Sequence, residues 1–286
     1  MAGSEKKTAL ILGGGGPAGI AWECGLLLGL QDAGIDLSQA DRIVGTSAGS
    51  IVGTHLAVLG SLEQLFAARK DPLKDTAHPP KMSKLMWAFL VAKLFHRSVD
   101  GQRRSIGRAA RRAKVQGEQD WLARIAGFLP KPPTPEEPWP DRDLLLTSID
   151  AVSGQLNLWT RDSGIPLSTA VASSCAVPCV FPLVHVGGHP YMDGGIGSST
   201  NAALGAGFKT VVILDPIARL LGKRSPVHAE IQKLKAQGST VTFLAFDDRI
   251  HALVGKNLMD SSRGQRIAEL GREQGQKAAG ELQQQS

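Results

Sequence analysis

A glycine-rich turn near the start of the chain constrains the fold more than any other feature. Residues 13–19 read GGGGPAG, with a short apolar run at 8–12 before them and a longer one at 20–30 after them. These lengths predict a strand, a loop and a helix in that order. Glycines let the backbone approach a negative group closely. That group is either the pyrophosphate of a dinucleotide or the negative charge of a transition state.

A second unit of the same kind follows directly. Residues 41–44 predict a short strand, Gly45-Thr46-Ser47-Ala48-Gly49 a tight turn, and residues 50–60 a buried helix. A G-x-S-x-G turn between strand and helix is typical of a nucleophile elbow, where small neighbours permit the bend and helix N–H groups favour negative charge. The alternative is a Gly/Ser-rich turn without chemistry.

The rest of the chain alternates between strand-like and helix-like segments. Strands are expected within 143–160, beside a hairpin turn at 187–188, and at 209–216 and 240–247, with a helix at 166–176. This alternation predicts an α/β fold built in layers around one sheet.

The same pattern indicates how the chain is organised. We expect a single domain over residues 1–286, with a core at about 8–216 and a C-terminal strand and helices at 217–286 packed on it. Residues 61–140 interrupt the pattern as a helical, basic insertion. It ends in a Pro-rich loop at 129–140, whose six prolines exclude a helix or a central strand.

A serine needs a base to become a good nucleophile, and two kinds are available. None of the seven histidines lies in a motif that marks it as the partner, although His251 follows the last strand, where an α/β-hydrolase carries its histidine. Asp193 lies in YMDGGIG, where Gly194 and Gly195 allow a tight loop. Partial burial would raise its pKa toward the working pH. The alternative is an Asp-Gly turn that closes a hairpin.

The glycine loop fits two kinds of site. It satisfies G-x-G-x-x-G, so a dinucleotide-binding oxidoreductase using residues 13–19 is one interpretation. That fold needs an acid at the end of the second strand, whereas Asp36 and Asp41 precede this strand. An oxyanion hole uses both glycine motifs in one site and is preferred. An ordinary α/β-hydrolase is disfavoured, because only two strands precede Ser47.

Four motifs in this order resemble the patatin-like phospholipase family. They are the glycine loop after the first strand, the G-x-S-x-G turn after the second, the segment ASSCAVPCVFP at 172–182, and Asp193-Gly194-Gly195. The resemblance spans about residues 8–216, and the segment 61–140 matches poorly. One departure is Ala18, where the family usually carries Arg or Lys, so the preference for a phospholipid stays open.

The resemblance implies a three-layer α/β/α fold and a lipid acyl hydrolase of phospholipase A, lysophospholipase, lipase or esterase type. It makes Ser47 the nucleophile and Asp193 the base of a dyad, with no metal and no cofactor. The expected oxyanion donors are Gly14, Gly15 and Gly16, and the supporting motif glycines are Gly19, Gly45, Gly49, Gly194 and Gly195. A non-catalytic lipid-binding relative remains an alternative.

Positive charge is concentrated in one segment. The net charge is +6, yet residues 81–114 hold ten Lys or Arg against one acid, Asp100, and join this charge to an apolar run at 85–95. Apolar and basic residues together favour contact with anionic lipid, so we expect peripheral membrane contact through 81–114. The alternative is a helical cap packed on the core. Nucleic-acid binding is not expected, because aromatic residues are sparse.

The cysteines and the apolar runs indicate the cellular compartment in which the protein works. Cys24, Cys175 and Cys179 are odd in number and lie in apolar contexts, as buried thiols do in a reducing environment. No run approaches the ~18 apolar residues of a membrane-spanning helix. We therefore expect a cytoplasmic protein that acts on an acyl lipid, peripherally at the membrane. Its oligomeric state does not follow from the sequence.

Overall fold

The computed structural model describes most of the chain. The described residues are 7–68, 88, 89, 92, 94–96, 98–131, 139–222, 225–255 and 257–283. Within them one mixed sheet has eight strands: β1 (Thr8–Leu12), β2 (Arg42–Gly45), β3 (Asp143–Asp150), β4 (Leu156–Trp159), β5 (Val184–Val186), β6 (His189–Asp193), β7 (Thr210–Asp215) and β8 (Thr240–Ala245).

The strand order is β5-β6-β3-β2-β1-β7-β8, and β4 pairs with β3 outside this path. Strands β3, β2, β1, β7 and β8 are parallel, whereas β4, β5 and β6 make antiparallel pairs. Strand β2 pairs with one edge of β1, and strand β7, which comes much later in the sequence, pairs with the other edge of β1. Ligands of open α/β sheets bind at such a switch point, outside the carboxyl ends of the strands.

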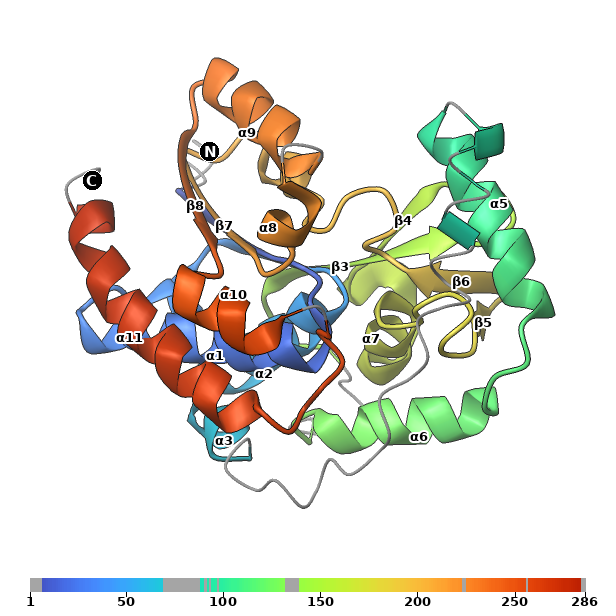
Figure 1. Cartoon of the computed structure of the whole chain (residues 1–286), viewed down its shortest axis with the longest axis horizontal. Helices are drawn as coiled ribbons and strands as arrows, with labels where there is room; N and C mark the ends of the chain where they lie inside the picture. Colours follow the sequence, from blue (N-terminus) through green and yellow to red (C-terminus); the bar gives the residue numbers. More distant parts are fainter. Residues whose placement is uncertain are drawn as a thin grey trace.

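Helices cover both faces of this sheet (Figure 1). The described α-helices are α1 (Gly16–Asp32), α2 (Ala48–Leu59), α3 (Glu63–Ala68), α5 (Val99–Arg112), α6 (Glu118–Phe128), α7 (Leu167–Ser174), α8 (Ala218–Leu221), α9 (Val227–Ala236), α10 (Asp248–Val254) and α11 (Gly264–Gln283). Short 3-10 turns occur at Leu37–Gln39, Arg161–Ser163 and Ala202–Gly205.

Alternating side chains of β1 divide the apolar interior into two cores. Leu10 and Leu12 join the cluster formed with α1, α2 and α11, whereas Ala9 and Ile11 join the cluster formed with α9. Figure 1 shows α9 on one side of the sheet and α1, α2 and α11 on the other. The expected α/β/α layers are confirmed.

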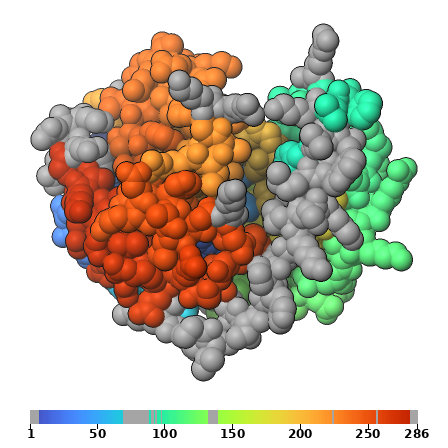
Figure 2. Space-filling view, viewed as in Figure 1, coloured from blue at the N-terminus to red at the C-terminus, as the bar shows by residue number. Residues whose placement is uncertain are grey.

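Every strand expected from the sequence is present, and part of the segment 61–140 is described. Its helices α3, α5 and α6 lie within it, and Ile106 of α5 packs with Ile149 and Met192 of the sheet. Figure 2 shows α5 and α6 (green) at the end of the molecule opposite α11 (red). The prolines between 132 and 138 and the basic residues Lys81, Lys84, Lys93 and Arg97 lie outside the described residues.

None of the helices in the described ranges combines the length and the hydropathy needed to cross a membrane. The three cysteines are all buried and free.

Helices α1 and α11 lie against each other at glycine positions. A Cβ added at Gly25 would overlap the Ala268 carbonyl, and one at Gly29 would overlap the Arg272 carbonyl. The backbones therefore approach more closely than any side chain would allow. This contact attaches the C-terminal helix to the helix that follows the glycine loop.

We expect Gly25→Ala to lower the free energy of unfolding by about 1–3 kcal/mol, because the new methyl group forces α1 and α11 apart. Urea unfolding followed by circular dichroism measures the change. Gly280→Ala is the matched control in α11, since an added Cβ there meets nothing within 4 Å. The control should be neutral or stabilising by up to about 1 kcal/mol. Equal effects of the two substitutions would contradict the steric explanation.

Candidate active site

Ser47 occupies a strained turn between β2 and α2. Its backbone has φ 52° and ψ −114°, a conformation that side-chain-bearing residues rarely adopt and that costs on the order of 1–3 kcal/mol. Ser47 is the N-cap residue of α2, yet its hydroxyl makes no capping hydrogen bond. Its N–H instead donates to Ser174 Oγ at 2.9 Å. The turn therefore leaves the hydroxyl available to another partner.

The glycines around Ser47 are required by close packing against β1. A Cβ at Gly49 would overlap the Leu12 carbonyl, and one at Gly45 would lie 2.6 Å from Ser50 Cα. Gly49 N–H also donates to Gly13 O at 2.9 Å, which joins this turn to the glycine loop. The helix can begin directly above the end of β1 only if these two positions lack side chains.

Asp193 reaches Ser47 from the antiparallel side of the sheet. Gly45 pairs with Leu146 of β3, and Ser148, two residues further along β3, pairs with Asp193 at the end of β6. This register carries Asp193 past the end of β2, to the level of Ser47. The Ser47 hydroxyl lies near enough to the Asp193 carboxyl to lower its pKa.

The Asp193 carboxylate is almost fully enclosed, with 5% of the residue exposed. Burial raises its pKa from 3.8 to about 6, although hydrogen bonds from Gly195 N–H and the Ser47 hydroxyl act in the opposite direction. The Gly195 N–H lies 2.7 Å from Asp193 Oδ1. The Gly195 N–H thus orients the carboxylate, and the Ser47 hydroxyl is the second group that lowers its pKa.

Asn201 connects the segments that carry Ser47 and Asp193, and it has no marker in the sequence. Its side-chain Nδ2 donates to Thr46 Oγ1 at 3.0 Å and to Gly194 O at 3.1 Å. The backbone of Asn201 is left-handed (φ 52°), a conformation that Asn tolerates better than most residues. Gly194 packs directly on Thr147, where a Cβ would overlap the threonine. These contacts fix the distance between the Ser47 turn and the Asp193 loop.

The glycine loop lies beside Ser47, as expected for an oxyanion loop, but one expected donor is occupied. A Cβ at Gly14 would lie 3.5 Å from Ser47 Cβ. Gly14 N–H, however, already donates to Ser199 O at 2.8 Å. Among the described residues, no acceptor takes the N–H groups of Gly15 and Gly16. The assignment of Gly14, Gly15 and Gly16 as oxyanion donors stays a prediction, and within the described residues the N–H groups without an acceptor are those of Gly15 and Gly16.

Two buried carboxyl groups stabilise the glycine loop and the segment that pairs with it, and neither was predicted from the sequence. Glu23 of α1 is fully buried and accepts Gly13 N–H at 2.8 Å. Asp215, at the end of β7, accepts the Ser199 hydroxyl at 2.9 Å. Burial raises both pKa values, that of Asp215 to about 6. The available signal was a single acid within the apolar run 20–30.

Gly19 lies one turn into α1, where an added Cβ would come within 3.3 Å of both Ala48 and Pro216. Ala18, next to it, is fully buried in the core and does not line the cavity described below. Its position therefore offers no place for a cation facing a ligand.

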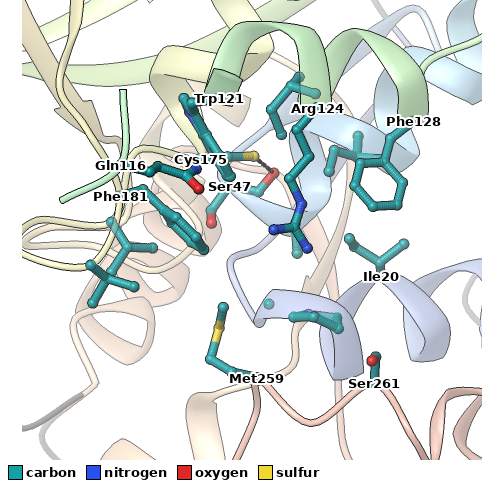
Figure 3. Close-up of a pocket in the computed structure, with 17 residues that line it drawn as sticks. Ile20, Ser47, Gln116, Trp121, Arg124, Phe128, Cys175, Phe181, Met259 and Ser261 are labelled. Atoms are coloured by element: carbon teal, nitrogen blue, oxygen red, sulfur yellow. Dashed lines mark hydrogen bonds between the residues drawn. The ribbon is translucent and has the colours of Figure 1, made fainter. Parts of the chain in front are cut away.

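A cavity of about 330 Å³ opens above Ser47 (Figure 3). Its lining comes from the first turns of α1 and α2, from α6, from residues 175–181 and from residues 259–261. Most lining side chains are apolar, including Ile20, Ile51, Trp121, Ile125, Phe128 and Phe181. The Trp121 ring stacks on Phe181 at 4.1 Å between centroids, which holds α6 as a wall of the cavity.

Cys175 is another nucleophilic side chain in this cavity. Its thiol lies 3.2 Å from Ser47 O and donates to it. Burial raises the pKa of this thiol to about 12, so the thiolate that would attack a substrate does not form at neutral pH. Ser47 is therefore the better candidate nucleophile.

No histidine lines the cavity within the described part of the chain. His251 lies in α10, and His55 Nδ1 lies 2.9 Å from Ile51 O within α2. The exposed side chains of His185 and His189 pair with Glu118 and with Asp150. Across the described ranges, no three His, Cys, Asp or Glu side chains are arranged to hold a metal ion.

The acids considered for a dinucleotide site lie at the wrong end of the sheet. Asp41 Oδ2 accepts Thr8 N–H at 2.8 Å, so it lies at the start of β1, opposite the glycine loop. Asp36 caps the 3-10 turn Leu37–Gln39 by accepting Ser38 N–H. Neither carboxylate can face a ribose bound at the loop.

Solved structures that are similar to this chain include VipD and ExoU. VipD from Legionella pneumophila shares 14% identity and a TM-score of 0.41, over 96% of this chain and 67% of that one. The type III effector ExoU shares 19% identity and a TM-score of 0.43, over 99% of this chain. In the heterodimeric ExoU–SpcU complex from Pseudomonas aeruginosa the values are 18% and 0.39, over 96% of this chain.

The chain spans about half of each ExoU chain, 53% and 52%. Because the sequence identities and TM-scores are this low, the structural similarity does not support an inference about activity. No curated protein matches the sequence. The model of the family "Patatin-like phospholipase", however, matches residues 10–205, which is more than half of the 286 residues. The chain therefore belongs to the patatin-like phospholipase family, a family of lipid acyl hydrolases.

Proposed function

We propose that this protein hydrolyses carboxylic esters of acyl lipids through a dyad of Ser47 and Asp193. The observation that carries the proposal is the approach of the strained Ser47 turn, which lines an apolar cavity, to the buried Asp193 carboxyl, whose raised pKa the Ser47 hydroxyl acts to lower. A carboxylate with a pKa of about 6 is a stronger base than an exposed one, yet it is still ionised at neutral pH.

In the proposed reaction, Asp193 accepts the hydroxyl proton while Ser47 Oγ attacks the ester carbonyl carbon. The tetrahedral intermediate collapses, the carbon–oxygen ester bond breaks, and Asp193 returns the proton to the leaving alcohol. A water molecule then attacks the acyl-enzyme, with Asp193 again as the base. The fatty acid leaves and Ser47 regains its proton, so no other reactant is consumed.

The developing oxyanion is assigned to the loop that follows β1. Gly15 and Gly16 lie at the start of α1, and their N–H groups are free among the described residues. A helix N-terminus adds positive potential there. The support comes from position, since the adjacent Gly14 lies directly beside Ser47.

We assign the acyl chain to the cavity, because its apolar lining matches a hydrocarbon chain. A volume of about 330 Å³ lies at the lower end of the usual range for small-molecule sites. This size favours one acyl chain bound at a time.

We propose peripheral membrane contact through the described part of the basic segment. Leu94 and Phe95 are 70% and 76% exposed, which is unusual for large apolar side chains. Arg104, Arg108, Arg111, Arg112 and Lys114 are exposed on or just beyond α5. Arg103 is an exception, because its guanidinium Nε donates to Ile196 O at 2.7 Å and anchors α5 next to the Asp193 loop.

We expect Ser47→Ala and Asp193→Asn each to lower kcat/KM for a short-chain p-nitrophenyl ester by at least about 10³-fold, because nucleophile and base act as one unit. Asp162→Asn, an exposed carboxylate outside the cavity, is the matched control and should leave the rate unchanged. Wild-type turnover in both dyad variants would disprove the dyad. A wild-type protein that cleaves no acyl ester would favour a non-catalytic lipid-binding protein.

The rate should depend on the ionisation of Asp193. Below its pKa of about 6 the carboxyl group is protonated and cannot accept the serine proton, so kcat/KM should fall about tenfold per pH unit there and level off above. A stopped assay between pH 4.5 and 8.5 measures the profile. His251→Gln should not move the midpoint, and a midpoint that disappears in this variant would assign the base to His251 instead.

We expect the protein to sediment with vesicles that contain anionic lipid and much less with neutral vesicles. At about 1 kcal/mol for each basic residue near the surface, the triple variant Arg108→Gln/Arg111→Gln/Arg112→Gln should bind up to ~100-fold more weakly. Leu94→Ser/Phe95→Ser should also weaken binding. Leu220→Ser/Leu221→Ser removes a comparable exposed pair from α8 as the control. Equal binding of the wild type to both kinds of vesicle would contradict the electrostatic contribution.

A further inference from the structure

One charged side chain enters the cavity above Ser47. Among the described residues that line the cavity, only Arg124 carries a charge. It lies in the middle of α6, between Trp121 and Ile125, which are both buried in the same wall. Figure 3 shows its guanidinium extending from α6 into the cavity, near Ile20.

The Arg124 guanidinium has no partner of its own within the described residues. No carboxylate there lies within 4.0 Å of it, and it makes no hydrogen bond. Arg124 is an exposed residue, so its five N–H donors are open to water and to a ligand that enters the cavity. Guanidinium groups bind carboxylates and phosphates through two parallel hydrogen bonds, and water exclusion around an apolar ligand strengthens such contacts.

The glycine loop supplies no cation to this cavity. The side chain of Ala18 is buried in the core, so residue 18 contributes nothing to the wall of the cavity. Arg124 comes instead from a helix that is far away in sequence. A single positive charge thus lies close to the proposed nucleophile but outside the glycine loop and the dyad.

We propose that Arg124 binds the headgroup phosphate of a phospholipid while the acyl chain occupies the apolar part of the cavity. This inference rests on the proposed function and names its substrate class. In a glycerophospholipid the phosphate lies a few bonds from the scissile ester, so both groups fit one cavity with Ser47 at its base. Arg124 is then a specificity-determining residue, and it takes no part in the proton transfers.

The test compares two soluble substrates that differ only in the phosphate, 1-hexanoylglycerol 3-phosphate and 1-hexanoylglycerol. For the wild type, kcat/KM should be higher with the phosphate. Arg124→Gln should lower kcat/KM for the phosphate ester by about 10–100-fold, mainly through KM, because a hydrogen bond to a charged group contributes about 1.5–3 kcal/mol. The neutral ester should change less than about twofold.

Two further variants control this experiment. Arg124→Lys keeps the charge but loses the paired hydrogen bonds, so its kcat/KM for the phosphate ester should be intermediate. Lys235→Gln removes one exposed positive charge from α9, away from the cavity, and should leave both substrates unaffected. An equal loss of kcat on both substrates would overturn the proposal, since it would place Arg124 in the ester chemistry.

A binding measurement separates this proposal from the proposed hydrolysis. Hexyl phosphate should bind to the wild type and to Ser47→Ala, and at least about tenfold more weakly to Arg124→Gln, by isothermal titration calorimetry. If it does so while no ester is cleaved, the hydrolase function fails and the anion site stands. If inorganic phosphate binds equally well, or if only hexanoate responds to the substitution, the ligand is free phosphate or a fatty acid and the phospholipid assignment is wrong.

Discussion

The contact between the turns that follow β1 and β2 is the constraint on which the site depends. Thr46 N–H donates to Leu12 O at 3.0 Å, and Gly49 N–H donates to Gly13 O at 2.9 Å. Because the two strands are parallel neighbours, both turns emerge at the same edge of the sheet. Any side chain at Gly49 would separate them. This contact places the free N–H groups of the glycine loop beside Ser47.

Asp193 is brought to the site by antiparallel pairing of strands, whereas the two turns follow parallel strands. Asp193 ends a strand that runs antiparallel to β3, and Asn201 ties the loop that follows to Thr46. Burial raises the pKa of the Asp193 carboxyl and so makes the carboxylate a stronger base, but it also lowers the stability of the folded chain. Since the pKa in the folded chain, about 6, exceeds the ordinary value of 3.8, the ionised carboxylate lowers the free energy of unfolding above pH 6, and the effect vanishes below pH 3.8.

The proposed reacting groups and the proposed binding surface come from different parts of the chain. The proposed reacting groups follow the ends of β1, β2 and β6, where strands hold them rigidly. The cavity wall comes from α6 and from the segments 175–181 and 259–261. Arg124 belongs to this wall, so substrate preference can change with α6 while the dyad stays in place. The same helix leads back to α5, whose basic surface is proposed to face the lipid.

The sequence was enough to predict the strands, the two glycine-containing turns and the candidate residues Ser47 and Asp193, because these depend on local periodicity and on positions that tolerate only glycine. It did not determine which N–H groups of the glycine loop are free, since the partner of Gly14 is Ser199, far along the chain. Asn201 and Arg124 also have no local signature, and Glu23 is marked only as a single acid within an apolar run. Their roles arise only when distant segments are packed together, because burial and hydrogen-bond partners are properties of the tertiary structure.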